Sequence, residues 1–154
     1  PDFLFHLAEI EGIRYFFVLL PEPLLGLYDD RPGESPIILL HDRIRCNRRL
    51  LRCVMAEEMG HHFTSTGHLL AFACTSKCFY VKQEMVALWW ATQNLVPFSA
   101  LLDAINNKKI FLTHELAEHF DVTERFMGSA LKLYFEKKED ELLRKIEKMP
   151  EEIV

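Results

Sequence analysis

The sequence predicts an α+β fold, and three observations support this. Short runs rich in β-branched and aromatic residues, typical of strands, gather between residues 13 and 40. Stretches with helical periodicity dominate the rest of the chain. The chain has 154 residues, 49% of them apolar, so it is long enough to bury a substantial core. We therefore expect one domain, or one domain with a small appendage, built from a small mixed sheet and several helices.

The first 45 residues predict a helix followed by the sheet. A short helix is expected at 2–11, where Gly12 ends it. Strands are expected at 13–20, 24–28 and 37–40. The Pro21-Glu22-Pro23 run separates the first two strands, and the loop at 29–36 contains two prolines and a glycine.

The remaining residues predict helices joined by turns. Asn47 can cap a helix that runs to about Phe63, and a long loop of mixed pattern follows at 64–79. The next helix, 80–95, ends before Pro97 because the residue preceding a proline disfavours helical geometry. Three further helices are expected at 98–105, at 113–120 and, capped by Thr123, from there to about residue 148. We divide the chain into a core at 1–97 and a helical module at 98–154.

Residues 115–133 have the pattern of a helix-turn-helix unit, but their charge does not suit DNA recognition. From residue 111 to residue 135 there are four acidic and two basic side chains, which are Glu115, Glu118, Asp121, Glu124, Arg125 and Lys132. A recognition helix normally presents Arg, Lys, Asn or Gln to base edges. We therefore interpret the unit as a packing module or as a surface that docks a protein substrate.

Overall composition limits the classes of function. The net charge of -5 argues against a general nucleic-acid binder, and no apolar run approaches the roughly 20 residues that span a bilayer. Cys46, Cys53, Cys74 and Cys78 are expected to be free thiols. A four-cysteine zinc site needs two close pairs, and only the last two cysteines are spaced that way. We expect a cytoplasmic protein that binds neither membranes nor nucleic acid directly.

One short motif carries most of the functional information. Residues Glu57-Glu58-Met59-Gly60-His61 have the form of the zinc-protease motif H-E-x-x-H with Glu in place of the first His. A carboxylate can also bind a metal, so Glu57 and His61 form a possible ligand pair at i and i+4. Glu58, between them, is then the candidate general base, and Gly60 leaves room for another segment to pass close by. The alternative is a helix with an internal Glu–His hydrogen bond and no metal.

A helical wheel places these polar residues within the apolar side of the helix. Arg48, Arg49 and Arg52 fall on the opposite side, which predicts that they mark the exposed face. Buried carboxylates are costly unless they are paired or bind a metal. No Lys or Arg of this helix faces Glu57 and Glu58, so a divalent cation is the natural partner.

Catalytic zinc usually takes three protein ligands and a water, so a third ligand must come from elsewhere. Glu84 is the best candidate because it lies on an apolar stripe of the next helix. Its other interpretation is a surface Glu near a helix N-terminus. His68 is a rival ligand. His62 has two interpretations. It either donates a hydrogen bond that orients a metal ligand or stabilises an oxyanion, or it is a partly buried core histidine.

The chain resembles the ImmA/IrrE family of zinc metallopeptidases, in the form found in prophages of Gram-positive bacteria. The resemblance extends from about residue 13 to residue 136. It rests on Gly26-Leu27-Tyr28, LRCVMAEEMGHH at 51–62, Phe63-Thr64 with Gly67, KQEMVALWWATQNLVP at 82–97 and ELAEHFDVTERF at 115–126.

This resemblance implies a zincin-like core at 1–97 and a helical module with the helix-turn-helix-like unit at 98–154. It implies metal ligands at Glu57, His61 and Glu84, and Glu58 as general acid and base. Most family members have His where this chain has Glu57. Two carboxylates and one His make a weaker Lewis acid than the usual set, so manganese or iron become alternatives to zinc.

The resemblance also implies a reaction and a partner, because the family is thought to cleave helix-turn-helix repressors and so derepress mobile elements. The sequence therefore predicts a metal-dependent endopeptidase that hydrolyses a peptide bond in a protein, such as a phage repressor. The alternative is a non-catalytic protein-binding regulator on a decayed peptidase scaffold.

Overall fold

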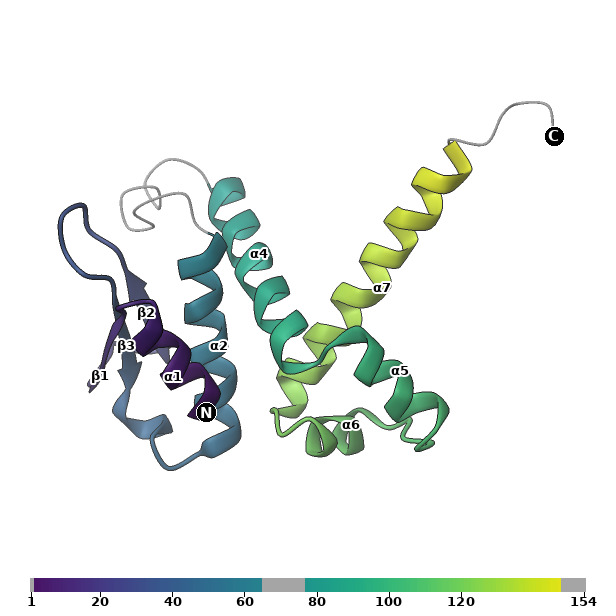
Figure 1. Ribbon diagram of the computed structural model, residues 1–154, viewed down its shortest axis with the longest axis horizontal. Helices are drawn as coiled ribbons and strands as arrows, with labels where there is room; N and C mark the ends of the chain where they lie inside the picture. The colour runs from purple at the N-terminus through teal and green to yellow at the C-terminus, as the bar shows by residue number, and fades with distance from the viewer. Residues whose placement is uncertain (1, 65–76, 148–154) are drawn as a thin grey trace.

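The computed structural model describes residues 2–64 and 77–147 (Figure 1). The fold is α+β, as predicted. A three-stranded mixed sheet has the order β1-β3-β2, with β1 (Arg14–Val18) parallel to β3 (Ile37–His41) and β2 (Gly26–Asp29) antiparallel to it. Six α-helices accompany it among the described residues: α1 (Asp2–Ile10), α2 (Arg48–Thr64), α4 (Lys77–Leu95), α5 (Phe98–Asn106), α6 (Thr113–His119) and α7 (Glu124–Glu147).

Helix α2 lies between the sheet and α4 (Figure 1). It contacts β2 and α1 on one side and α4 on the other, while α6 and α7 pack against each other. The central strand β3 contributes the fully buried Ile38 and Leu40 to the core beneath α2, which adds Met55 and Met59. The second half of α2 is therefore held between a sheet and a helix.

Local signals set most helix boundaries where the sequence predicts them. Gly12 has a positive φ of 69° and ends the turn after α1. The Asn47 side chain accepts a hydrogen bond from the Leu50 backbone at 3.1 Å, and Thr123 accepts one from Phe126 at the same distance. Both are the predicted N-caps.

The helices that flank the predicted loop at 64–79 extend into it by one residue at its start and three at its end, and the rest of the loop, 65–76, lies outside the described residues. Helix α2 continues to Thr64, whose hydroxyl donates to the carbonyl of Gly60 at 2.7 Å, and α4 begins at Lys77. His68 and Cys74, two residues considered as metal ligands, lie outside the described residues. A short 3-10 helix, η1 (Asp42–Ile44), is an element that the sequence did not predict.

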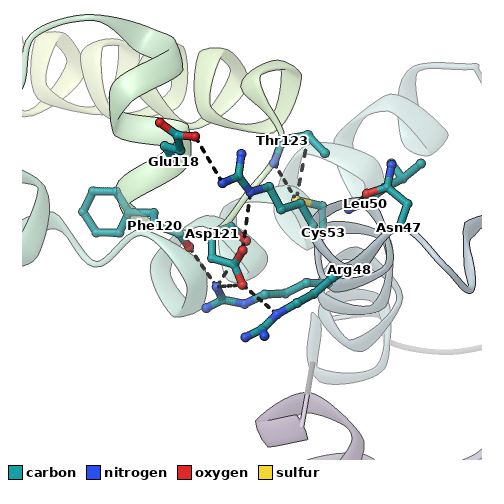
Figure 2. A network of polar contacts seen from close by, with 10 residues as sticks. Asn47, Arg48, Leu50, Cys53, Glu118, Phe120, Asp121 and Thr123 are labelled. Carbon is teal, nitrogen blue, oxygen red and sulfur yellow. Dashed lines mark hydrogen bonds and ion pairs between the residues drawn. The ribbon is translucent and has the colours of Figure 1, made fainter.

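The arginine side of α2 stays exposed in part, as the wheel predicted, since the Arg48 side chain is 72% and the Arg49 side chain 43% exposed, but it also has a partner that the wheel did not show. Its three arginines converge on the turn between α6 and α7, as Figure 2 shows. Arg52 donates to the Phe120 carbonyl at 2.8 Å, and Arg48 contacts the Asp121 carboxylate at 3.1 Å. The wheel separated the two faces correctly, but the partner of this face lies about seventy residues further along the chain.

Among the described residues, no single helix is long and apolar enough to cross a membrane. The bent pair formed by Val81–Leu95 and Phe98–Asn106 passes that test of length and composition only when its two helices are taken together.

Candidate metal centre

Two glycines allow the polar residues of α2 to sit between β2 and α4. A Cβ atom at Gly60 would overlap the backbone carbonyl of Ala87 in α4, so only glycine permits this approach of the two helices. A Cβ atom at Gly26 in β2 would overlap the carboxylate of Glu58. The prediction that Gly60 admits a close segment is confirmed. A glycine within a strand often marks such a close approach, and that signal at Gly26 was available in the sequence.

Glu58 is a buried carboxylate, 9% exposed, that lies against the strand β2. The backbone N–H of Tyr28 donates a hydrogen bond to it. Burial raises the pKa of Glu58 to about 8, with the charges of Glu57 and Glu84 adding to the effect and His61 and the Tyr28 hydrogen bond opposing it. In this environment Glu58 holds a proton at neutral pH unless a nearby cation removes the cost of its charge.

Glu57 is half-buried and occupies the neighbouring position. Burial, followed by the charge of Glu84, raises the pKa of Glu57 to about 7, while Arg125 and His61 act in the opposite direction. Arg125 comes from the first turn of α7. The wheel considered only charges on α2 itself, so this cation was missed.

The predicted pair of His61 and Glu84 is present. Nε2 of His61 lies 3.5 Å from Oε1 of Glu84. Burial acts to lower the pKa of His61, but the hydrogen bond with Glu84 and the charges of Glu58, Glu84 and Glu57 raise it overall. Nδ1 of His61 is buried without a hydrogen-bond partner among the described residues. Among the described residues, the His61 ring thus contacts the Glu84 carboxylate through Nε2 and has no hydrogen-bond partner at Nδ1.

Glu84 itself is less buried than the sequence predicted. Its side chain is 44% exposed, and the neighbouring Val81 and Met85 are also exposed. Leu88 is partly buried and packs against the core, and Ala87, on the side facing Gly60, is fully buried. Glu84 therefore lies at the border between the buried and exposed sides of α4, and its contact with His61 joins it to the site.

His62 links three elements. Its Nδ1 accepts or donates a 2.9 Å hydrogen bond with the Tyr28 hydroxyl, and its Nε2 lies 3.7 Å from the Glu11 carboxylate. Tyr28 thus holds His62 through its side chain and Glu58 through its backbone. These contacts give His62 a role in fixing α2 against β2 and the end of α1.

A cavity of about 320 Å³ opens beside Glu57 and Glu58. Its walls come from the segment leading into β2, from α2, from Leu88 of α4 and from the start of α7. The lining residues are Pro23, Leu24, Leu25, Gly26, Leu50, Cys53, Val54, Glu57, Glu58, Leu88, Thr123, Arg125, Phe126 and Ser129. A larger cavity of about 560 Å³ lies around Trp89, Phe98 and Tyr134, but none of the candidate site residues lines it.

The described residues contain no ready group of three His, Cys, Asp or Glu side chains that could hold a metal ion. One pair of donor atoms is spaced as two metal ligands would be. Two donor atoms that each lie about 2.1 Å from a tetrahedral metal are about 3.4 Å apart, close to the 3.5 Å between His61 and Glu84. Glu57 lies one helical turn before His61, but it lines a cavity that neither His61 nor Glu84 lines.

Two of the four cysteines, Cys46 and Cys53, have described side chains. Cys46 is exposed and Cys53 is buried, and both are free thiols. The Thr123 backbone N–H donates to Sγ of Cys53 at 3.4 Å, and burial raises the pKa of the Cys53 thiol. Cys53 is thus a packing contact between α2 and the start of α7.

Comparison of the chain with protein-family models, with curated proteins and with solved structures gave no match.

Proposed function

We propose that this chain is a metal-dependent endopeptidase with a zincin-like core, of the ImmA/IrrE type. The observation that carries the proposal is the position of Glu58. It is a buried carboxylate with a raised pKa, one residue from Glu57 and three from His61, and it faces a cavity at the edge of the sheet. Perturbed carboxylates beside a cavity are typical of acid–base sites.

Glu57, His61 and Glu84 would hold the metal, with zinc as the first choice and manganese or iron as alternatives. When bound, a divalent metal supplies the Lewis acidity that polarises a peptide carbonyl and acidifies a water molecule. His61 would act through Nε2, the nitrogen directed at Glu84. The role of His62 and Tyr28 is to keep α2 and β2 in register around this group.

Glu58 then moves the proton. With the cost of its charge reduced by a cation, it is deprotonated and accepts a proton from the attacking water. It later donates that proton to the leaving amine, because the same carboxyl serves as base and acid in successive steps. The hydrogen bond from the Tyr28 backbone holds the carboxyl in place throughout.

A protein substrate suits the surroundings of Glu58. In the described sheet β2 pairs with β3 on one side only, so its other edge is open. The His41 N–H donates to the Leu25 carbonyl, which places the backbone groups of Gly26 and Tyr28 on the open side. The Tyr28 N–H already donates to Glu58 there, so a substrate strand would pair through the backbone groups of Gly26. Extended peptides add to such edges. The proposed substrate is a helix-turn-helix repressor, docked in part by the helix-turn-helix-like unit of α6 and α7.

A Glu58→Gln variant tests the proposal. Co-expressed with a repressor encoded nearby, the wild-type chain is expected to cleave it, and the variant is expected to bind zinc but leave the repressor intact. Glu9→Gln, a change at an exposed carboxylate of α1, is the matched control and should cleave like wild type. Cleavage that persists in Glu58→Gln would refute the mechanism.

A second function is favoured by one observation, the direct His61–Glu84 contact without a ready three-ligand group in the described residues. A scaffold of this kind could act as a non-catalytic regulator that binds its protein partner. That function predicts a stable complex of wild-type chain and intact repressor, with equal binding by Glu58→Gln and no cleavage at any zinc or manganese concentration.

A further inference from the structure

A cavity of about 480 Å³ lies against the arginine side of α2. Its polar lining consists of Arg48 and Arg52 of α2, His119 of α6 and Asp121 in the turn before α7, and none of these side chains lines the cavity beside Glu58. Two guanidiniums against one carboxylate leave a positive charge at this cavity, in a chain whose net charge is -5. The charge of the lining therefore favours an anion.

The two arginines use only part of their hydrogen-bond donors within the described part of the chain. Arg48 donates through Nε to the Asp121 carboxylate at 3.1 Å (Figure 2), and its two terminal nitrogens donate to no described acceptor. Arg52 donates through Nη1, to the carbonyls of Phe120 and Asp121 at 2.8 and 3.2 Å. A guanidinium has five N–H donors in a planar fork that matches the paired oxygens of a carboxylate or phosphate. The Arg48 side chain is mostly exposed, so its terminal nitrogens are accessible to a ligand.

The Asp121 carboxylate holds these arginines in place, and its own charge is offset. Arg48 and Arg52 lie 3.1 and 3.7 Å from Oδ2 of Asp121. Arg49, which does not line the cavity, lies 3.4 Å from Oδ1 and 3.6 Å from the Glu118 carboxylate. Three guanidiniums around two carboxylates still leave one positive charge. The arginines are thus positioned before a ligand arrives, which reduces the entropy lost on binding.

The rest of the cavity wall is apolar. Leu4 of α1 and Leu95 of α4 are almost fully buried, Phe120 is partly buried, and Phe3 is exposed. Sites for small molecules usually have volumes of about 300–1,000 Å³ and combine apolar walls with a few placed polar groups. An inorganic ion would leave the apolar wall in contact with water. A ligand with an anionic group on an apolar body fits both parts of the lining.

We propose that this cavity binds a small organic anion. The terminal nitrogens of Arg48, together with Arg52, hold its carboxylate or phosphate, and its apolar body lies against Leu95 and Phe3. The site is separate from the candidate metal centre and does not depend on the proposed peptidase activity. Its walls come from α1, α2, α4 and α6 with the turn that follows it. A bound anion therefore stabilises the folded chain, because it binds only where these elements are packed together.

Calorimetric titration of the purified chain tests the proposal, using phenyl phosphate, hexanoate, inorganic phosphate and benzyl alcohol as probes. The tighter of the first two should bind at least about tenfold more tightly than inorganic phosphate, which lacks the apolar body, and than benzyl alcohol, which lacks the charge. Whether phenyl phosphate or hexanoate is the tighter identifies the anionic group. A chelator should not change these affinities, because neither arginine lines the cavity beside Glu58.

Variants of the lining separate binding from a structural role. Arg48→Gln should weaken the tighter probe about tenfold or more, and Arg48→Lys, which keeps the charge but not the fork, should recover only part of the loss. Lys132→Gln is the matched control, because it removes one positive charge at an exposed side chain outside the cavity, and it should bind like wild type. Phe3→Ala should reduce the preference for the organic anion over inorganic phosphate.

The ligand-free Tm of each variant is measured beside its affinity, because a purely structural role of Arg48 would lower the Tm and leave the affinity unchanged. Unchanged binding by Arg48→Gln, or an equal loss in Lys132→Gln, would overturn the proposal. So would organic anions that bind no more tightly than inorganic phosphate, or not at all. If Arg48→Gln does not fold, Arg48→Lys and Phe3→Ala still decide the outcome, since full affinity in the first or an unchanged preference in the second contradicts the site.

Discussion

Helix α2 carries two charged faces, which differ in how far their charges are paired with opposite charges. On one, Arg48, Arg49 and Arg52 converge on Asp121, and the charges pair at the turn before α7 (Figure 2). On the other, Glu57 and Glu58 gather with little compensation, and the pKa of each is raised. Opposite charges that meet in pairs are typical of a structural contact. Like charges held together in partial burial are typical of a functional site.

The largest expected effect concerns the close packing that holds the acidic face against α4. Gly60→Ala should lower the free energy of unfolding by about 2–3 kcal/mol, because the added methyl group overlaps the Ala87 carbonyl. Gly128→Ala in α7 is the control, since its Cβ would meet nothing, and it should be neutral or stabilise by up to about 1 kcal/mol. Urea denaturation measures both. Equal tolerance of the two changes would show that α2 and α4 do not approach so closely.

A smaller effect concerns pH. The pKa of Glu58 is raised in the folded chain, so the folded state binds more protons than the unfolded state between about pH 4.5 and pH 8. The stability of the metal-free protein should therefore be highest below this range and fall as pH rises through it, by roughly 1–3 kcal/mol. The raised pKa of His61 acts in the same direction.

Denaturation in the presence of a chelator at pH 5.5, 7 and 8.5 checks this prediction. Glu58→Gln should make the fall with pH smaller, because it removes one of two carboxyls with raised pKa values, while Glu57, with a pKa raised to about 7, still titrates in this range. Glu115→Gln should leave the profile unchanged. Stability that rises with pH in the wild type would contradict the description of the acidic face.

The smallest effect is expected on the arginine face. Asp121→Asn should cost about 0.5–1.5 kcal/mol, because it weakens contacts with three arginines that are partly exposed. Asn tolerates the positive φ of 52° at this position, so the backbone should not be strained. The loss should diminish in high salt, and zinc affinity should change little. A loss above about 3 kcal/mol would mean that this face is the more important of the two.

Much of the fold was predictable because its boundaries depend on local chemistry. Asn47 and Thr123 cap the helices that follow them, and Pro97 follows the end of α4, as expected. The pairing of the arginine face with Asp121 was not predictable from α2 alone, because Asp121 reaches this face only through tertiary packing. The structure places the arginines and the acidic residues of α2 on separate faces, as the wheel did, and each face packs in part against other elements.

In the candidate site, too, the residues close in sequence were predictable and those brought in by tertiary packing were not. Glu57, Glu58 and His61 were predicted from spacing within one helix, and Glu84 was predicted to join them and does contact His61. Arg125 could not be placed from local patterns, since it lies 67 residues after Glu58 and reaches the cavity only when α7 packs near α2. The sequence left open whether Glu84 is buried or a surface residue, and its side chain is 44% exposed, because an apolar stripe read from sequence does not show which side of α4 remains uncovered.

Zinc binding tests the central claim, that the acidic face of α2 is a metal centre, most directly. Isothermal titration of the chelator-treated chain should show a single zinc ion bound per chain. Binding should be retained in Glu58→Gln and reduced at least about a hundredfold in His61→Ala, because a neutral nitrogen ligand is lost. Zinc binding that is absent in the wild type, or unchanged in His61→Ala, would contradict the account.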